Sequence, residues 1–287
     1  MTILVVGATG QVGGGVVREL SGAGVPFRAL VRSPEKADDL RGYDAEIAIG
    51  DLEHPESLDD ALRGVAAAFL LTPSSPQQPD LEGAFADAAA RATERPHVVK
   101  LAAFSWQHGD VALARWHRAS VERLAASGHP HTVLAPTSFM QNLLAGASGI
   151  AKGVLAQPQV EAPIAFVDTR DVAAVAAHIL QHPQAHVGRS YAITGPEALT
   201  YAQVAERLGG CIGHAVRYEP ATDDQFRQDM LGVGLTEQLV GALAELTEVQ
   251  RAGGAAEVTD EVTKATGRPA RSIDDFVRDH ASAFRPV

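Results

Sequence analysis

Residues 2–13 read TILVVGATGQVG, and this stretch decides the fold. Four of its first five residues are apolar and most are β-branched, which predicts a short buried strand. Glycines follow at positions 7, 10 and 13, in the strand–turn–helix setting of a dinucleotide-binding turn. In such a unit Gly7 permits a tight turn, Gly10 lets the backbone approach a pyrophosphate, and Gly13 lets the helix pack closely.

The helix expected after this turn would present free backbone N–H groups and a partial positive charge to phosphate groups. A glycine turn with a purely structural role is the alternative. The strand before it and the helix after it favour cofactor binding. The predicted cofactor contacts are Gly7, Thr9, Gly10, Gln11, Val12 and Gly13.

The second predicted strand, residues 27–31, bears on the choice between NAD and NADP. NAD-selective sites usually end this strand with an acidic residue that binds the ribose 2′-hydroxyl. Here Arg32 follows instead, and a guanidinium can bind a 2′-phosphate and stack on adenine. Lys36 adds a positive charge one helical turn later. The sequence therefore predicts NADPH (NADP) as the cofactor, with a solvated Arg32 at the strand end as the alternative.

Two further strand ends complete the predicted cofactor site. The carboxylate of Asp51 could accept a hydrogen bond from the adenine amino group, while the next side chain covers the ring. An N-cap for a helix near residues 55–62 is the alternative role of Asp51. The segment after the fourth strand should pass the nicotinamide ribose, because ligands gather at the carboxyl ends of parallel strands. The predicted contacts are Asp51, Leu52, Leu71, Thr72 and Pro73.

Six apolar runs predict strands, with helical patterns at about 80–94 and 112–127 between the later ones. This alternation predicts an α/β fold, a Rossmann-type doubly wound parallel sheet with helices on both faces. The six runs are residues 2–6, 27–31, 45–49, 65–71, 97–102 and 131–135.

The pattern loosens from about residue 136, which predicts a smaller, mainly helical C-terminal part that binds the substrate. We expect residues 1–155 and 168–195 to form the NADP-binding domain, and 156–167 with 196–287 the smaller part. Short β-like segments are expected at 163–167 and 190–194. Helices are expected near 169–182, 200–209 and 222–231, and Ser272 with Asp275 suggests a capping box at a late helix.

Composition excludes several classes of function. The 287 residues carry 24 Lys and Arg against 35 Asp and Glu, a net charge of −11. This balance argues against nucleic-acid binding and against an anionic membrane surface. Cys211 is the single cysteine, which favours a reducing compartment. No apolar run has the length of a membrane span. We expect a cytoplasmic monomer or homodimer that acts on a small molecule, with no nucleic-acid or membrane partner.

Several motifs together resemble the NmrA-like atypical short-chain dehydrogenase/reductases, in particular the NAD(P)H quinone oxidoreductase and triphenylmethane reductase branch. The resemblance implies an NADPH-dependent oxidoreductase that delivers hydride to a carbonyl or quinone of a small aromatic or polyketide-like molecule. The family also contains non-catalytic regulators, so an NADP(H)-sensing protein that binds a partner protein is the alternative. The motifs lie at residues 7–13, 31–36, 50–52, 116–117, 135–142 and 167–172.

The usual catalytic pair of short-chain dehydrogenases, Tyr-x-x-x-Lys, is absent from the sequence. By its position in the resemblance, His117 is the candidate general acid, since imidazole donates protons near neutral pH. A packed histidine is the alternative. Ser105 could hydrogen-bond a substrate carbonyl. We interpret Lys100 as a strand-face residue rather than a catalytic amine.

Substrate contacts are expected after the sixth strand. Phe139, Met140 and Asn142 should line the cleft, where Phe and Met suit a flat aromatic molecule; ordinary helix packing is the alternative. Asp168 and Asp171 are interpreted as structural helix-capping residues. Histidines at 178, 182 and 186 have the spacing of a metal-binding face, but Pro183 breaks that helix, and we predict no metal site.

Overall fold

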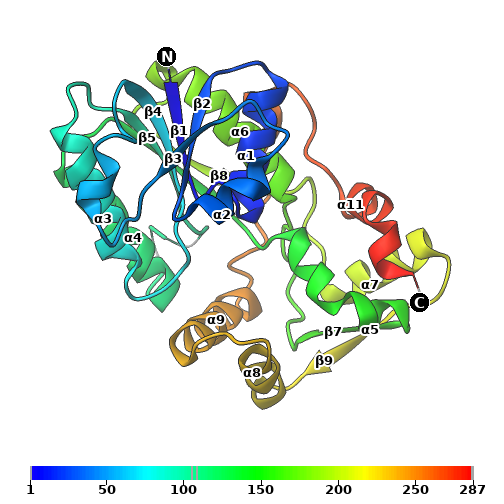
Figure 1. Cartoon of the computed structure of the whole chain (residues 1–287). Helices are drawn as coiled ribbons and strands as arrows, with labels where there is room; N and C mark the ends of the chain where they lie inside the picture. Colours follow the sequence, from blue (N-terminus) through cyan, green and yellow to red (C-terminus); the bar gives the residue numbers. More distant parts are fainter. Residues whose placement is uncertain (1, 105, 108, 286–287) are drawn as a thin grey trace. The chain divides into compact units, whose positions relative to one another are not determined.

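The computed structural model describes residues 2–104, 106–107 and 109–285, and its largest feature is a seven-stranded sheet (Figure 1). The strand order is β3-β2-β1-β4-β5-β6-β8, and the pairs from β3 through β6 are parallel. The six strands from β3 through β6 in this order therefore end at one edge of the sheet. The strands are β1 (Thr2–Val6), β2 (Phe27–Val31), β3 (Glu46–Ile49), β4 (Val65–Leu70), β5 (His97–Leu101), β6 (His131–Pro136) and β8 (Ser190–Ile193).

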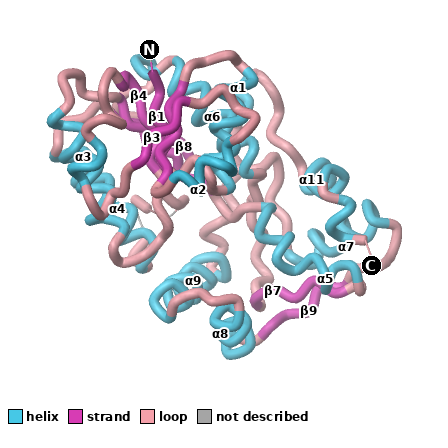
Figure 2. Tube along the Cα trace, viewed as in Figure 1, coloured by secondary structure: helices cyan, strands magenta, loops and turns pink. Residues whose placement is uncertain are grey.

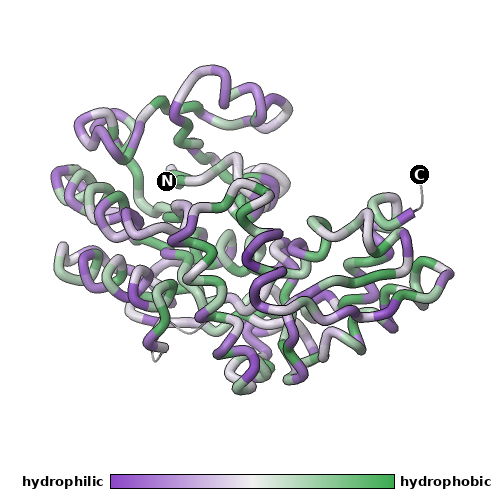
Figure 3. The backbone as a smooth tube through the Cα atoms, turned by 90° about the horizontal axis from the view of Figure 1, so that it is seen from below, coloured by the Kyte–Doolittle hydropathy of each residue, from purple (hydrophilic) through white to green (hydrophobic). Residues whose placement is uncertain are grey.

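Helices cover both faces of this sheet (Figure 1). On one face Leu4 and Val6 share a buried cluster with Phe85 of α3 and Leu124 of α4. Alternate residues of β1 point to the opposite face, on the side of α1 and α6. The helices are α1 (Gln11–Gly22), α2 (Pro34–Ala37), α3 (Gln78–Arg91), α4 (Ala112–Ala126) and α6 (Thr169–Gln181), with short 3₁₀ turns at Asp38–Leu40, Pro55–Leu58 and Pro183–Ala185. Figure 3 shows hydrophobic and hydrophilic stretches alternating along the helices, as amphipathic helices require.

The chain divides into two compact units. The first comprises residues 1–109, 114–135 and 172–191, and the second 110–113, 136–171 and 192–287. The second unit contains a two-stranded parallel sheet of β7 (Val154–Pro158) and β9 (Arg217–Ala221), seen in Figure 2. Its helices are α5 (Ala147–Ala151), α7 (Tyr201–Ile212), α8 (Asp223–Gly232), α9 (Glu237–Arg251), α10 (Glu261–Thr266) and α11 (Ile273–Asp279), with 3₁₀ segments at Met140–Gly146 and Ala281–Phe284.

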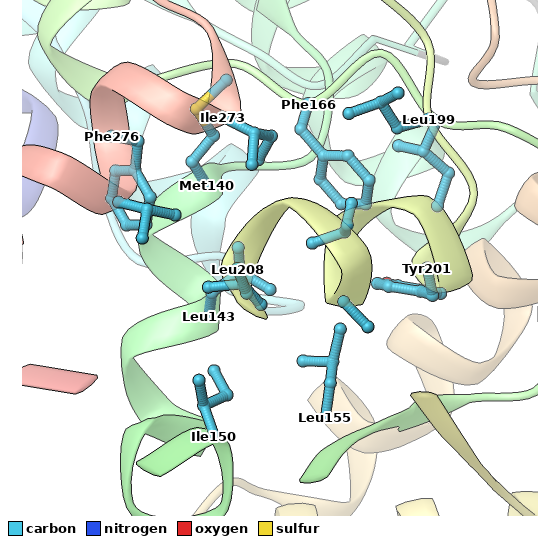
Figure 4. Packing of buried hydrophobic residues seen from close by; sticks show 14 of the residues in the cluster. Met140, Leu143, Ile150, Leu155, Phe166, Leu199, Tyr201, Leu208, Ile273 and Phe276 are labelled. Carbon is cyan, nitrogen blue, oxygen red and sulfur yellow. The ribbon is translucent and has the colours of Figure 1, made fainter. Parts of the chain in front are cut away.

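An apolar cluster of its own holds the second unit together (Figure 4). The Tyr201 ring lies 5.5 Å from that of Phe166 and stacks on Tyr218 at 5.7 Å. Gly195 packs so closely that a β-carbon there would lie 1.9 Å from the carbonyl oxygen of Phe166. The buried members labelled in Figure 4 are Met140, Leu143, Ile150, Leu155, Phe166, Leu199, Tyr201, Leu208, Ile273 and Phe276.

The α/β fold class and the six strands of the first unit match the sequence prediction, with ends that differ by one residue at most. Three differences concern the second unit. Residues 136–155 belong to it rather than to the first, because Met140, Ile150 and neighbouring side chains enter its core, and residues 168–171 and 192–195 also belong to it. Residues 163–167 form isolated bridges, not a strand. Strands β7 and β9 were not predicted, since neither alternates clearly between buried and exposed residues.

The capping box at Ser272 is confirmed: its hydroxyl accepts from the N–H of Asp275, whose carboxylate accepts from the N–H of Ser272. In the part of the chain that the structure describes, no helix is both long and apolar enough to cross a membrane.

Candidate functional site: a glycine turn and a buried polar cluster

The glycine turn after β1 has little room for side chains. Gly7 has φ +78°, and a β-carbon on it would lie 2.8 Å from the carbonyl oxygen of Leu71. A β-carbon on Gly13 would lie 2.0 Å from the carbonyl oxygen of Gly7, which excludes any larger residue. On Gly10 the same atom would lie 3.3 Å from that oxygen, a tight but tolerable contact. Gly13 therefore allows the turn to pack closely against itself. Gly10 leaves the outer surface of the turn without a side chain at that position.

The turn opens directly onto helix α1. Gly10 is the N-cap, and among the described residues no side chain caps this helix terminus and no acidic residue lies in its first turn. Thr9, Gly10 and Gln11 are exposed, while Val12 is buried and anchors the turn. The positive end of the helix dipole thus lies at exposed residues with no capping side chain, an arrangement that fits the pyrophosphate of a dinucleotide.

Charged side chains follow the ends of β2 and β3. Arg32 is exposed directly after β2, and Lys36 is exposed with its ammonium 3.7 Å from the carboxylate of Asp39. Asp51, half-buried after β3, accepts a hydrogen bond of 3.1 Å from the N–H of Glu53. It does not cap the following short helix, whose N-cap is His54. The alternative role as an N-cap is therefore not observed. Leu52 is buried against the apolar cluster under α3.

The end of β4 meets both the glycine turn and the interior. The carbonyl of Leu71 lies against Gly7, as described above, and Pro73 is exposed. Thr72, 7% exposed, donates its hydroxyl to Oε1 of Glu82 at 2.8 Å. Thr72 thus connects the predicted nicotinamide region with a cluster of buried polar side chains beneath it.

This cluster, hereafter the polar cluster, consists of Thr72, Gln78, Glu82, Lys100 and His117, from the β4 end, α3, β5 and α4. The Lys100 ammonium lies 2.9 Å from Oε1 of Glu82, and both side chains are 1% exposed. The same ammonium donates to the backbone carbonyl of Leu101 and lies 3.4 Å from Nδ1 of His117. The amide nitrogen of Gln78 donates to Glu82 at 3.2 Å and lies 3.2 Å from the same Nδ1.

Burial controls protonation in the polar cluster. The pKa of His117 is well below its usual value, because burial and the nearby Lys100 ammonium both disfavour the imidazolium. Burial also lowers the pKa of Lys100, and the Glu82 carboxylate opposes that shift. Among the described residues, Oε1 of Gln78 and Oε2 of Glu82 are buried without hydrogen-bond partners. At neutral pH His117 is therefore a neutral imidazole beside an ion pair.

The residues predicted as catalytic candidates lie in different surroundings. His117 is 4% exposed, and Nδ1 of its imidazole lies in the polar cluster. Ser105 lies outside the described residues. Lys100 is on a strand as predicted, but its amine is part of a buried network and not of a simple strand face. Sequence reasoning missed Gln78 and Glu82 altogether.

The substrate candidates belong to the second unit. Met140 is 1% exposed inside its apolar cluster, which is the packing role considered as the alternative. Phe139 is half-buried and Asn142 exposed. Asp168 is fully buried and accepts from Arg170 and Gln141. This confirms the structural interpretation of Asp168.

The spaced histidines lie near one another but pack ring against ring. The rings of His178 and His182 are tilted with centroids 4.6 Å apart, and His186, after the break at Pro183, lies edge-on to His178 with centroids 5.7 Å apart. Among the described residues no group of three or more His, Cys, Asp or Glu side chains could hold a metal ion.

Comparison with known proteins identifies the family of this chain. The model of the NmrA-like family matches residues 1–283. The chain belongs to the NmrA-like family. It is 40% identical to an NAD(P)H azoreductase of Xenophilus azovorans over 283 residues, covering 98% of this chain and 99% of that one. It is 39% identical to the (4-alkanoyl-5-oxo-2,5-dihydrofuran-3-yl)methyl phosphate reductase of Streptomyces griseus, covering 99% of each.

A solved structure agrees with the NmrA-like assignment. The NADPH-dependent quinone oxidoreductase of Escherichia coli, crystallised with NADPH, superimposes with a TM-score of 0.87 at 27% identity. The match covers 98% of this chain and 99% of that one. This confirms the predicted family, whose motifs the sequence carried.

The polar cluster of this NmrA-like protein gave a weak signal in the sequence. Lys100 stands between apolar neighbours in the run HVVKLA, and Glu82 lies on a helix rich in alanine. A charged residue in a fully buried strand pattern needs a partner of opposite charge. That argument could have predicted a pairing, but it could not have chosen Glu82 among 35 carboxylates.

Proposed function

We propose that the protein is an NADPH-dependent reductase that transfers hydride to a carbonyl or quinone of a small conjugated molecule. The observation that carries the proposal is the bare glycine turn between β1 and α1, with a free helix N-terminus beside it. Two relatives of about 40% identity are named as reductases, and a solved relative with the same fold is crystallised with NADPH.

The residues present fit this cofactor. The turn residues Thr9, Gly10 and Gln11 are exposed for the pyrophosphate, and Arg32 is exposed at the strand end for a 2′-phosphate. Thr72 and Leu71 form the strand end expected beside the nicotinamide ribose. When bound there, the reduced nicotinamide would supply the hydride.

The protein's own task is to position the electrophile and to provide a proton. In this proposal His117 is the proton donor, and Phe139 and Asn142 contact the substrate as predicted from the sequence. Reduction of a quinone forms a stabilised anion, so the absence of Tyr-x-x-x-Lys is compatible with catalysis that depends chiefly on positioning. Met140 has no part in this proposal, because it belongs to a hydrophobic core.

A turnover assay tests the proposal directly. Purified protein is mixed with NADPH and a panel of quinones, aromatic ketones and an azo dye, and the loss of NADPH absorbance is followed. We expect substrate-dependent oxidation of NADPH by the wild type and strongly reduced oxidation by Gly10→Ala. Tight NADPH binding without turnover on any compound would contradict a reductase and favour an NADP(H)-sensing regulator.

A further inference from the structure

The polar cluster has a hydrogen-bonding pattern that specifies the state of His117. Nδ1 of this imidazole lies 3.4 Å from the Lys100 ammonium and 3.2 Å from the Gln78 amide nitrogen. Both neighbours are donors, since an ammonium has no lone pair and the Gln78 nitrogen is oriented by its bond to Glu82. Nδ1 must therefore be the acceptor, and the proton of the neutral imidazole is on Nε2.

Glu82 organises both donors. Its Oε1 accepts from Thr72 at 2.8 Å, from Gln78 at 3.2 Å and from Lys100 at 2.9 Å. If the Gln78 amide were reversed, its oxygen would face this carboxylate oxygen, which is electrostatically unfavourable. The carboxylate thus fixes the amide orientation, and the amide in turn fixes the acceptor role of Nδ1.

Each hydrogen of the Lys100 ammonium has an acceptor. The three hydrogens of its ammonium have three acceptors: the Glu82 carboxylate, the Leu101 carbonyl and Nδ1 of His117. The side chain is 1% exposed, so the ammonium has no direct exchange with bulk water. Of these three acceptors, the His117 imidazole has a second nitrogen, Nε2, through which it can pass a proton onward.

A neutral imidazole is a poor proton donor by itself, because loss of the Nε2 proton would leave an imidazolate. That cost disappears if Nδ1 receives a proton in the same step. Lys100 is placed to supply it, and burial favours its conversion to a neutral amine. The Gln78 amide can donate a hydrogen bond to Nδ1 but has no proton to transfer.

We propose that Lys100, Gln78 and Glu82 hold His117 as its Nε2–H tautomer, and that Lys100 is the proton source of a concerted relay of two proton transfers through this imidazole. The inference rests on the proposed reductase function. The anion left by hydride transfer takes the Nε2 proton, while Nδ1 takes one from the Lys100 ammonium. The imidazole stays neutral and Lys100 becomes an amine. A proton from water at Nε2, with return of the Nδ1 proton to Lys100, restores the starting state.

In this scheme His117 is the catalytic residue and Lys100 is a positioning residue that acts through it. Among the described residues, the charged and polar groups around Nδ1 of His117 are Glu82 and Gln78 on α3, Lys100 on β5, and Thr72 behind Glu82. Replacement of Lys100 alone would leave the Glu82 carboxylate buried without a counter-ion, which is expected to destabilise the fold.

The test therefore uses the double variant Lys100→Met/Glu82→Gln, which removes both charges and keeps an acceptor for Thr72. Gln78→Met is the matched control, because it removes a hydrogen bond to Nδ1 without removing a proton source. The three proteins are labelled with ¹⁵N-histidine, and the His117 signals are assigned by their loss in His117→Gln. Nitrogen shifts, which report tautomer and protonation without any substrate, are recorded as the pH is varied.

In the wild type we expect a single Nε2–H tautomer at neutral pH. In the double variant His117 should become protonated at higher pH than in the wild type, since the neighbouring positive charge is gone. An Nδ1–H tautomer or an imidazolium in the wild type at neutral pH would overturn the assignment. The same titration curve in wild type and double variant would overturn the coupling to Lys100.

Turnover then separates the relay from the hydrogen bonding. We expect kcat to fall about 10- to 100-fold in the double variant, with KM values nearly unchanged, since general-acid contributions are of this order or larger. In Gln78→Met, kcat should fall less than about threefold. Equal losses in the two variants would overturn the relay. If no substrate is reduced at all, the proposed function fails, while the nuclear magnetic resonance result still decides the tautomer.

Discussion

The glycine turn and the polar cluster lie at the same edge of one sheet, yet they are built in opposite ways. The turn is formed by seven consecutive residues, three of them glycines, and leads into a helix N-terminus that no side chain caps among the described residues. The polar cluster joins side chains from four elements between Thr72 and His117, all 7% exposed or less. In the turn, the backbone conformation depends on the absence of β-carbons at the glycines. In the cluster, the side-chain positions depend on hydrogen bonds that support one another.

This difference predicts how each region responds to substitution. A change in the turn should affect cofactor binding or local packing, depending on which glycine is replaced. A change in the polar cluster should affect proton transfer with little effect on binding.

The largest effect is expected for His117→Ala. Loss of the proton donor should lower kcat by about 10²- to 10⁴-fold, with much smaller changes in NADPH and substrate affinity. Steady-state kinetics and NADPH titration provide the two quantities. His129→Ala is the matched control, since His129 is 3% exposed and its imidazole Nε2 hydrogen-bonds the carbonyl of Ala86. If both variants lose the same activity, a purely structural role for His117 is the better explanation.

The next largest effect separates two glycines of the turn. Gly10→Ala should fold normally, because its β-carbon meets one atom at 3.3 Å, but the methyl group would obstruct the pyrophosphate. Loss of one or two charge-assisted backbone hydrogen bonds should weaken NADPH binding by about 100-fold. Gly13→Ala should instead lower the melting temperature, because its β-carbon would overlap the Gly7 carbonyl oxygen at 2.0 Å. Calorimetric NADPH titration and thermal unfolding of both variants test this assignment. Weaker NADPH binding in Gly13→Ala together with a lower melting temperature in Gly10→Ala would contradict it.

A smaller and more selective effect is expected at Arg32. Arg32→Ala should lower the affinity for NADPH by roughly 10- to 150-fold, from the loss of a charge-assisted contact of about 1.5–3 kcal/mol. NADH has no 2′-phosphate, so its affinity should hardly change. Arg63→Ala, another exposed arginine in the first unit, is the control. Equal losses for the two dinucleotides in Arg32→Ala would exclude the phosphate-binding role.

The smallest effect concerns a buried histidine outside the polar cluster. His97 is 2% exposed, with Nε2 2.9 Å from Oγ1 of Thr132. Burial, and then the neighbouring His131 and His186, lower its pKa to about 4. The unfolded chain, with a pKa near 6.5, binds more protons than the native state between these values. This contribution to stability is complete above pH 6.5 and is lost as the pH falls toward 4.

Urea unfolding measures this contribution. Between pH 7 and 5 the wild type should lose about 2 kcal/mol more of its free energy of unfolding than His97→Gln does. Parallel losses in the two proteins would show that another group is responsible. His117 adds a contribution in the same direction, so the comparison between variants is more informative than the wild-type profile alone.

The candidate site could be predicted from the sequence where it is formed by residues that are close together in the chain. The turn around Gly7 and Gly13 and the position of Arg32 after β2 need only neighbouring residues to be interpreted. Met140 shows the opposite case. Its place after the sixth strand suggested a substrate contact, but the packing of the second unit draws its side chain into the core.

The sequence by itself determined the α/β fold of the first unit, the glycine turn and the family, because β-branched runs, glycine spacing and strand ends act over a few residues. Only the tertiary structure decided the partner of Lys100, the protonation of His117 and the allocation of residues 136–155 to the second unit. The physical reason is desolvation. A buried charge is stabilised by whichever partner the folded chain brings within hydrogen-bond distance, and here that partner is on a helix 18 residues away in the sequence, at Glu82.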